Sequence, residues 1–198
     1  MADEETLGVY RAKAEDYARM VAGIGSNRHL DAFIAALPAG AHVLDLGCGT
    51  GNASAAMVEA GLTIDPWDGS PEMAKVARDQ FGLDVQVKTF DMLTAIEAYD
   101  GVYANFSLLH APKADMPANL DRCAQALKPS GILHLGLKTG SGEARDKLGR
   151  FYAYYSDAEI TGLLEAAGLS VTSRVTGEEA GLDGAVAPWI ITKAKKND

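Results

Sequence analysis

The sequence is poor in cysteine, has fewer basic than acidic residues and lacks any long apolar run. Its two cysteines, Cys48 and Cys123, are too few for a disulfide framework. Without a run of about 18 apolar residues no membrane-spanning helix is expected, and no basic N-terminal segment leads into an apolar stretch as in a secretory signal. The 18 Lys and Arg residues against 27 Asp and Glu residues give a net charge of −9, which disfavours nonspecific binding to phosphate backbones. We therefore expect a soluble, cytoplasmic protein that binds neither membranes nor nucleic acid.

The composition is that of a globular protein. Hydrophobic residues make up 47% and charged residues 23% of the 198 positions, and this length suits one domain. Glycine accounts for 21 of the 198 residues, which is more than its usual share of about 7%. This excess indicates several tight turns or close backbone approaches.

Short β-rich runs alternate along the chain with helical patterns, which is typical of a parallel sheet with helices on both faces. The patterns predict helices at about 3–22, 29–37, 52–60, 71–81, 116–127 and 157–167. They predict strands at 41–45, 62–67, 85–90, 99–105, 132–137, 169–175 and 185–192. Gly23, Gly25 and Ser26 are expected to end the first helix, and residues 128–131 to form a turn.

A glycine-rich loop, Gly47-Cys48-Gly49-Thr50-Gly51, follows the first strand and leads directly into a helix. Glycine lets a ligand approach the backbone, and a helix N-terminus offers free N–H groups. The spacing is Gly-x-Gly-x-Gly, and Asn52 stands where a nicotinamide-type fingerprint has Gly or Ala. The carboxylate of Asp45, two residues before the loop, would repel a pyrophosphate and attract an ammonium group. The loop predicts a ligand with a cationic amine; the plainer interpretation is a glycine turn with a capping aspartate.

Residues 43–51 resemble motif I of the class I S-adenosylmethionine-dependent methyltransferases. The resemblance covers nearly the whole chain, and residues 185–191 look like the family's closing antiparallel strand. It implies a Rossmann-like, doubly wound seven-stranded α/β sheet, mostly parallel with an antiparallel last strand, in a single domain. It also implies that Gly47, Cys48 and Gly49 line the methionine part of S-adenosylmethionine and that Asp45 faces its amino group. Residues 149–155 look like bacterial small-molecule methyltransferases related to tellurite-resistance-type enzymes.

A ribose-binding carboxylate is expected about twenty residues beyond the loop, where Asp65 and Asp68 both lie. Residues 68–73 resemble the family's stretch after the second strand, which gives the ribose role to Asp68 and places Gly69 and Met73 at the cofactor. Pro66 departs from the family pattern and removes a ladder donor in a strand expected to be interior. A local bulge there could give the role to Asp65 instead.

The end of the third strand carries the expected adenine contacts. In the family an acid at this point meets the adenine amino group and the next residue's backbone meets a ring nitrogen, and Asp91 and Met92 match this pattern. Core packing is the alternative for the Met92 side chain. Together with Asp45 and Asp68, Asp91 would surround a ligand that carries sulfonium and ammonium groups.

The fourth strand ends at Asn105. Because ligands of open α/β sheets sit at the switch point between the first and fourth strands, we expect Asn105 to bind the cofactor near its methyl group. The segment Asn105-Phe106-Ser107 lacks both the Pro-Pro-aromatic pattern of DNA amino-methyltransferases and the Pro-Cys of cytosine carbon methyltransferases, which argues against DNA as a substrate. His110 is the candidate general base. The alternative is a loop histidine with a structural hydrogen bond. No metal site is expected.

A basic, aromatic-rich stretch spans residues 145–155. We expect Lys138, Arg150, Tyr152 and Tyr154 to shape a pocket for a small polar or anionic substrate, and the alternative is a solvated loop whose tyrosines pack at an edge. Tyr10 and Tyr17 lie two turns apart on one helix face. In small-molecule members of the family such tyrosines belong to a lid, here about residues 1–37, over a cofactor-binding core at 41–198. The alternative is simple packing on the sheet.

These features predict an enzyme that moves a methyl group from S-adenosylmethionine to a small molecule and leaves S-adenosylhomocysteine. One alternative is a protein that binds S-adenosylmethionine without turnover. A tRNA or protein methyltransferase is disfavoured because the chain has no basic patch, and a nicotinamide oxidoreductase is disfavoured by Asn52 and Asp45. The sequence leaves monomer and homodimer open.

Overall fold

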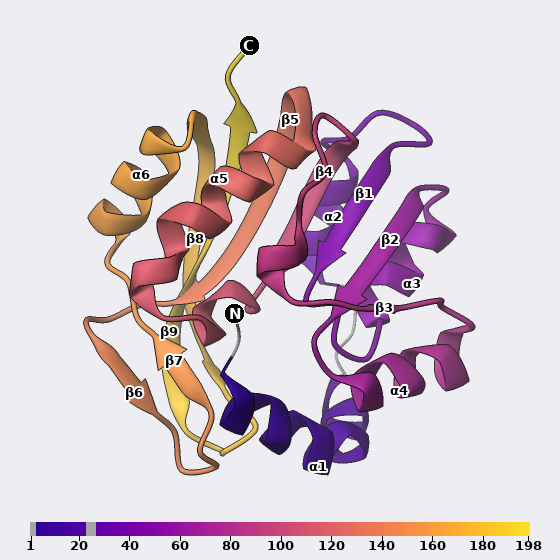
Figure 1. Cartoon of the computed structure of the whole chain (residues 1–198), viewed down its shortest axis with the longest axis vertical. Helices are drawn as coiled ribbons and strands as arrows, with labels where there is room; N and C mark the ends of the chain where they lie inside the picture. Colours follow the sequence, from indigo (N-terminus) through magenta and orange to yellow (C-terminus); the bar gives the residue numbers. More distant parts are fainter. Residues whose placement is uncertain (1–2, 23–26) are drawn as a thin grey trace.

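The computed structural model describes residues 3–22 and 27–198. A seven-stranded sheet forms its centre, with the strand order β3-β2-β1-β4-β5-β9-β8 (Figure 1). The strands are β1 (His42–Leu46), β2 (Thr63–Asp68), β3 (Gln86–Val87), β4 (Tyr99–Asn105), β5 (Leu127–Lys138), β8 (Leu169–Ala180) and β9 (Val186–Lys196). Strands β1 to β5 are parallel, and β9 is antiparallel to both of its neighbours, β5 and β8. The predicted doubly wound sheet with an antiparallel last strand is therefore confirmed.

Helices cover both faces of this sheet (Figure 1). The helices are α1 (Glu4–Ala22), α2 (Arg28–Ile34), α3 (Asn52–Glu59), α4 (Pro71–Phe81), α5 (Met116–Ala126) and α6 (Asp157–Ala166). Because successive side chains of a strand point to opposite faces, Leu44 belongs to the core beneath α5 and α6, whereas Val43 packs with Phe33 of α2 and Met57 of α3. Helix α1 lies across the C-terminal ends of β1 and β2, next to α4 (Figure 1).

Local sequence signals account for several helix boundaries. Ser70 accepts a hydrogen bond from the Met73 amide at the start of α4, and Pro71 occupies the first turn. Ser156 and Glu159 form the predicted capping box of α6. The residues expected to end α1, Gly23, Gly25 and Ser26, lie outside the described residues.

The structure differs from the prediction in three places. The third strand is only two residues long, and Phe90–Met92 forms a 3₁₀ turn, η1, instead of a strand end. Residues 128–131, expected as a turn, belong to β5, where Ser130 has a φ of 62°. Between β5 and α6 the chain forms a small antiparallel hairpin of β6 (Glu143–Arg145) and β7 (Phe151–Ala153) that the sequence analysis did not predict. Two further 3₁₀ turns, η2 (Leu108–His110) and η3 (Lys113–Asp115), follow β4.

The short β3 explains why Pro66 is tolerated inside β2. Strand β3 pairs with β2 only at Trp67 and Asp68, so Pro66 has no partner residue on the β3 side. On its other side Pro66 lies opposite Asp45 of β1 without a shift in register. The proline therefore causes no bulge in the β1–β2 ladder.

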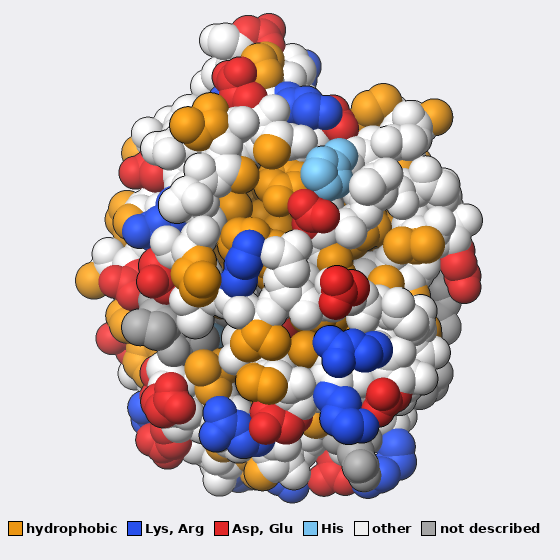
Figure 2. Space-filling model, turned by 45° about the vertical axis from the view of Figure 1, so that its right-hand side comes forward, with side chains coloured by type: hydrophobic (Ala, Val, Ile, Leu, Met, Phe, Trp, Pro, Cys, Tyr) orange, Lys and Arg blue, Asp and Glu red, His pale blue; other side chains and the backbone are white. Residues whose placement is uncertain are grey.

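The surface mixes charges of both signs. On the face shown in Figure 2, basic side chains lie among acidic ones, and hydrophobic side chains show in a hollow beside a histidine. Among the residues that the structure describes, no helix combines the length and apolarity needed to cross a bilayer.

Candidate functional site

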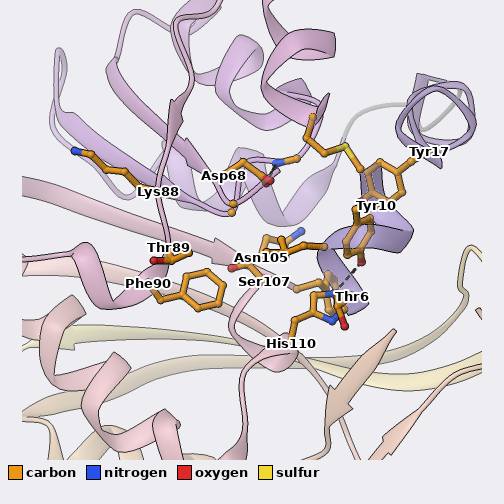
Figure 3. Close-up of a pocket in the computed structure, with 16 residues that line it drawn as sticks. Thr6, Tyr10, Tyr17, Asp68, Lys88, Thr89, Phe90, Asn105, Ser107 and His110 are labelled. Carbon is orange, nitrogen blue, oxygen red and sulfur yellow. Dashed lines mark hydrogen bonds between the residues drawn. The ribbon is translucent and has the colours of Figure 1, made fainter. Parts of the chain in front are cut away.

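A pocket opens at the C-terminal ends of β1, β2 and β4, where the direction of strand order reverses. It encloses about 660 Å³, part of it open to solvent. Its walls come from α1, the β1–α3 loop, the end of β2, α4, the segment after β3, and the end of β4 with η2 (Figure 3). The lining residues are Thr6, Leu7, Tyr10, Tyr17, Gly47, Gly49, Asp68, Gly69, Met73, Lys88, Thr89, Phe90, Asn105, Phe106, Ser107 and His110.

The glycine loop forms one wall because no larger residue fits there. Gly47 has a φ of 83°, and a Cβ at this position would lie 2.3 Å from the Cβ of Ser107. The amides of Gly47 and Cys48 both donate to the carbonyl of Trp67, at 2.8 Å each, which ties the loop to β2. The Ser107 hydroxyl donates to the carbonyl of Leu46 at 2.5 Å and ties the end of β4 to the end of β1.

The two candidate ribose-binding acids lie in different places. Asp68 lines the pocket, and its carboxylate accepts hydrogen bonds from the amides of Gly49 and Ser70, each at 2.8 Å. Burial raises the pKa of Asp68, and these two bonds offset only part of that effect. Asp65 does not line the pocket: its carboxylate accepts from the Tyr99 hydroxyl at 2.9 Å and lies 3.2 Å from Nε2 of His42.

Asp45 is buried behind the glycine loop. It accepts a hydrogen bond of 2.6 Å from the Ser54 hydroxyl of α3 and does not line the pocket. Burial raises the pKa of Asp45 to about 7; the Ser54 bond opposes this rise, and the charge of Asp68 adds to it. Cys48 is half-buried and does not line the pocket either, and burial followed by the charges of Asp45 and Asp68 raises its pKa.

The predicted adenine-binding residues lie at the rim and do not line the pocket. Asp91 and Met92 belong to the η1 turn and are exposed, Met92 to 50%. The wall on this side is formed by Lys88, Thr89 and Phe90. Because residues 90–92 form the η1 turn, the pocket is lined on this side by the residues that precede Asp91.

Both predicted α1 tyrosines line the pocket opposite that wall (Figure 3). Their rings lie 6.0 Å apart and nearly perpendicular. The position of α1 is fixed by its contacts with the β6–β7 hairpin: the Phe151 amide donates to the Thr6 hydroxyl at 2.8 Å, and Arg145 pairs with Asp3 at 2.7 Å. Helix α1 therefore covers the pocket with the two tyrosines facing inward.

His110 is buried at the pocket wall and carries hydrogen bonds on both ring nitrogens. Its Nδ1 lies 2.7 Å from the Phe151 carbonyl, so this nitrogen must carry the proton and donate. Its Nε2 then accepts from the Tyr10 hydroxyl at 2.8 Å (Figure 3). Burial lowers the pKa of His110 to about 4; the Phe151 bond opposes this, and the charges of Arg150 and Lys138 reinforce it.

The four predicted substrate residues lie behind this histidine and do not line the pocket. Arg150 is buried and pairs with Asp146 at 2.6 Å, and its Nη1 lies 3.4 Å from the Tyr10 hydroxyl. The buried ring of Tyr152 lies 4.7 Å from that of His110. Lys138 is half-buried, with its Nζ 4.0 Å above the Tyr152 ring, and the ring of Tyr154 lies 6.2 Å from that of Tyr152.

Sequence reasoning placed Gly47, Gly49, Asp68, Gly69, Met73, Asn105, Tyr10, Tyr17 and His110 together, and all of them line the pocket. It missed Thr6, Leu7, Lys88, Thr89, Phe90, Phe106 and Ser107. Thr6 and Leu7 precede Tyr10 by about one turn, so the helical spacing that singled out Tyr10 could have found them. No sequence pattern indicated Phe106. Its side chain reaches the pocket because the backbone turns at the end of β4, where Phe106 has a φ of 56°.

Sequence comparison now adds to this geometry. A family model described as a methyltransferase domain matches residues 43–131, which include the glycine loop, Asp68 and Asn105. A curated ubiquinone biosynthesis O-methyltransferase of Xanthomonas axonopodis pv. citri is 39% identical over 105 residues, which are 50% of this chain and 43% of that protein. Over residues 43–131 the chain is therefore similar to S-adenosylmethionine-dependent methyltransferases.

Solved structures of methyltransferases share the fold of this chain. A 1,6-didemethyltoxoflavin-N1-methyltransferase of Burkholderia thailandensis, crystallised with 1,6-didemethyltoxoflavin and S-adenosylhomocysteine, aligns with a TM-score of 0.73 at 21% identity, over 100% of this chain and 92% of that chain. A TehB-like methyltransferase of Corynebacterium glutamicum aligns with a TM-score of 0.71 at 18% identity, over 94% and 99%. At these identities the likeness is one of fold. The sequence match spans less than half the length of the curated relative.

Proposed function

We propose that this protein transfers a methyl group from S-adenosylmethionine to a small-molecule methyl acceptor. The observation that carries the proposal is the convergence of Gly47, Gly49 and Asp68 on one pocket beneath α1. Ligands of open α/β sheets bind in this crevice, outside the carboxyl ends of the strands at the point where strand order reverses. The match of residues 43–131 to a methyltransferase-domain model supports the choice of methyl donor.

The residues of the pocket fit this cofactor. Gly47 and Gly49 let the methionine part approach the backbone, and Gly69 and Met73 line the wall beside the ribose. The carboxylate of Asp68 can accept from ribose hydroxyls while it keeps its bonds from the Gly49 and Ser70 amides. Asp91 and Met92, at the rim, stay predictions for the adenine end.

Electrostatics also favour a cationic ligand. Asp45 and Asp68 lie close enough for the charge of Asp68 to raise the pKa of Asp45, whose value of about 7 reflects burial first. A positive group near the glycine loop would relieve the repulsion between the two carboxylates. We therefore infer that Asp45 acts on the ammonium group from behind the loop, together with Cys48 and the loop backbone.

When bound, S-adenosylmethionine supplies a sulfonium methyl group that a nucleophile can attack. Tyr10 and Tyr17 would exclude water from the closed pocket, and the end of β4 at Asn105 would align the methyl acceptor. A general base must pass through its protonated form, and the burial that lowers the pKa of His110 to about 4 makes that form costly. The hydrogen bonds of His110 thus support its structural role over a role as base.

The network behind His110 supports a polar or anionic methyl acceptor. Arg150 and Lys138 bring two positive charges to the side of the pocket opposite the aspartates. Arg150 is neutralised by Asp146, so Lys138, half-buried above Tyr152, is the better candidate for an electrostatic contact with an acceptor. Tyr154 would then shape the outer part of this region. A phenolic acceptor belongs among those tested, since the curated relative is named as an O-methyltransferase.

The test is calorimetric titration of the purified protein with S-adenosylmethionine and S-adenosylhomocysteine, with NAD as the control ligand. We expect both sulfur compounds to bind and NAD not to bind, and an absence of binding by the two sulfur compounds would overturn the proposal. Release of S-adenosylhomocysteine in the presence of a panel of small phenols, carboxylates and amines then tests turnover. Tight binding with no release across the panel would favour a binding protein without turnover.

A further inference from the structure

The side chain of Asn105, at the end of β4, cannot rotate freely. Its Oδ1 lies 3.0 Å from Nε2 of His134, on the neighbouring strand β5. In the register of the two parallel strands, Tyr103 lies opposite His134 and Asn105 opposite Gly136. His134 therefore lies two residues before the position opposite Asn105, farther from the end of the sheet at which the pocket opens.

Gly136 provides the room in which the amide lies. A Cβ at position 136 would come within 2.6 Å of the Asn105 Oδ1 and within 3.2 Å of the Phe106 amide nitrogen. The Phe106 amide also donates to the Gly136 carbonyl at 3.0 Å, which fixes the backbone directly after Asn105. The hydrogen bond from His134 thus holds the asparagine oxygen against β5, and the absence of a side chain at Gly136 leaves room for it there.

The proton position on His134 decides which way the amide faces. The ring is fully buried and stacks on Tyr103, with centroids 4.2 Å apart and planes 24° apart. Burial lowers the pKa of His134 to about 3, so the ring is neutral and carries one proton. Its Nδ1 has no hydrogen-bond partner among the described residues. Because a buried N–H without an acceptor is costly, the proton belongs on Nε2, which donates to Asn105.

We propose that Asn105 presents its amide N–H groups to the atom of the methyl acceptor that is methylated, and that His134 is the positioning residue that fixes this orientation. The inference rests on the proposed function. With its oxygen engaged by His134, the amide can only donate toward the pocket. A hydroxyl oxygen or its anion can accept from the amide with one lone pair and attack the methyl group with another, whereas a neutral amine has a single lone pair, which the new bond needs. The site therefore selects an oxygen nucleophile over an amine.

The reaction balances for such a methyl acceptor. A lone pair of its oxygen forms the new C–O bond while the electron pair of the S–CH₃ bond returns to sulfur and leaves the neutral thioether. The hydroxyl proton is released to bulk water before α1 closes over the pocket, so the acceptor reacts as an anion. The N–H groups of Asn105 bind a second lone pair of this oxygen and so position it for attack on the methyl group.

Catechol and ortho-phenylenediamine are suitable probes, because they match in shape and differ only in hydroxyl against amine. An aromatic ring suits a wall that includes Tyr10, Tyr17 and Phe106. Each probe is titrated into the protein saturated with S-adenosylhomocysteine, and methyl transfer is followed with S-adenosylmethionine. We expect the wild-type protein to bind catechol at least about tenfold more tightly than the diamine.

Three variants separate positioning from simple stability. His134→Leu should lower kcat/KM for catechol about tenfold and reduce the preference for catechol, while the Kd for S-adenosylmethionine stays within about twofold. His134→Gln retains a side-chain N–H and should restore most of the loss. Asn105→Asp keeps the shape and removes the donors, and should abolish the preference. The side-chain amide signal of Asn105 in NMR, assigned by its absence from Asn105→Asp, should move on catechol addition in the wild-type protein and stay in place in His134→Leu.

Several results would overturn the inference: equal affinity for the two probes, affinity for neither, a preference for the diamine, or unchanged catechol kinetics in His134→Leu. A loss that appears instead in the Kd for S-adenosylmethionine would assign Asn105 to the cofactor. Failure of the proposed function is recognised earlier, because the wild-type protein would then bind no S-adenosylmethionine before any probe is added.

Discussion

Asp68 and Asp65 stand three residues apart on one strand but have different partners, and substitution should separate them. Asp68→Ala should weaken S-adenosylmethionine binding about 10- to 100-fold, because a hydrogen bond to a charged group contributes about 1.5–3 kcal/mol. Asp65→Asn is the matched control: its partners are Tyr99 and His42, so affinity should stay within about twofold. Calorimetry measures both. A larger effect for Asp65→Asn would mean that the ribose lies on the other face of β2.

His110 should make the stability of the protein depend on pH in a defined direction. Its folded pKa of about 4 lies below the ordinary value of 6.5, so the unfolded chain binds more protons between these two values. Stability that depends on neutral His110 is complete above about pH 6.5 and is lost as pH falls toward 4.

Comparison with His110→Gln isolates this effect, because the opposite slope expected from the raised pKa of Asp45 is common to both proteins. The difference in unfolding free energy between wild-type protein and variant, from urea denaturation, should fall from pH 7 to pH 4. A constant difference across this range would contradict the assignment of a buried, neutral imidazole.

Among single residues, the sequence located those whose place follows from a strand end or from helical spacing. The register of residues 68–73 identified Asp68, and the helical spacing identified Tyr10 and Tyr17. The sequence could not show that Asp146 neutralises the charge of Arg150, because that ion pair depends on the conformation of the turn between the two residues. Likewise, the partner of Asn105 comes from another strand, and only the sheet register brings His134 beside it.

In the loop between β1 and α3, the close approach of β4 determines which residue can occupy position 47. Gly47 and Gly61 have nearly the same φ, 83° and 84°, but a Cβ at Gly47 overlaps Ser107 whereas one at Gly61 meets open space. Gly61→Ala should cost about 1–2 kcal/mol of unfolding free energy from backbone strain alone. Gly47→Ala should cost roughly 1–3 kcal/mol more, because of overpacking, and should also impair cofactor binding. Urea denaturation of both variants tests this, and equal losses would contradict the close approach to β4.

The contact between α1 and the β6–β7 hairpin should limit how readily α1 moves away from the pocket. Arg145 pairs with Asp3 at 2.7 Å and with Glu5 at 3.3 Å. Arg174, which pairs with Asp157 at 2.9 Å on α6 and has the same side-chain exposure of 39%, offers a control. Neither change to Gln should measurably lower global stability, because exposed ion pairs contribute little.

Of the two variants, only Arg145→Gln should speed hydrogen exchange in α1, measured by mass spectrometry, because only the Arg145 ion pair joins α1 to the hairpin. Equal exchange of α1 in the two variants would show that this ion pair does not hold α1 in place.

The elements that the sequence predicted well are those with a strong period or a clear cap. The helices α4 and α6 begin at capping serines, and the strands of the sheet centre are apolar runs between glycines. The short β3 and the β6–β7 hairpin escaped prediction because their few residues gain their pairing from neighbours: β3 from the end of β2, and the hairpin from α1 and η2. Neither segment is long enough to show an alternation of apolar and polar residues from which a strand could be predicted.

Ligand binding should be visible in the stability of the whole molecule. S-adenosylmethionine at 100 times its dissociation constant should raise the unfolding free energy by about 2.7 kcal/mol. For a chain of this size that corresponds to an increase in Tm of roughly 5–11 °C. A thermal scan with and without ligand measures it, and NAD at the same concentration should leave Tm unchanged. An equal shift with NAD would indicate a general nucleotide site.

Strand β9 follows all the other elements along the chain, yet it lies inside the sheet between β5 and β8. While a ribosome still holds residues 186–196, β8 has no partner through which it could join the sheet, and β5 presents an unpaired edge. This half of the molecule can therefore assemble only after translation has passed Lys196. During that interval the exposed edge is open to association with other nascent chains, and a chaperone that shields extended segments would raise the yield of folded protein.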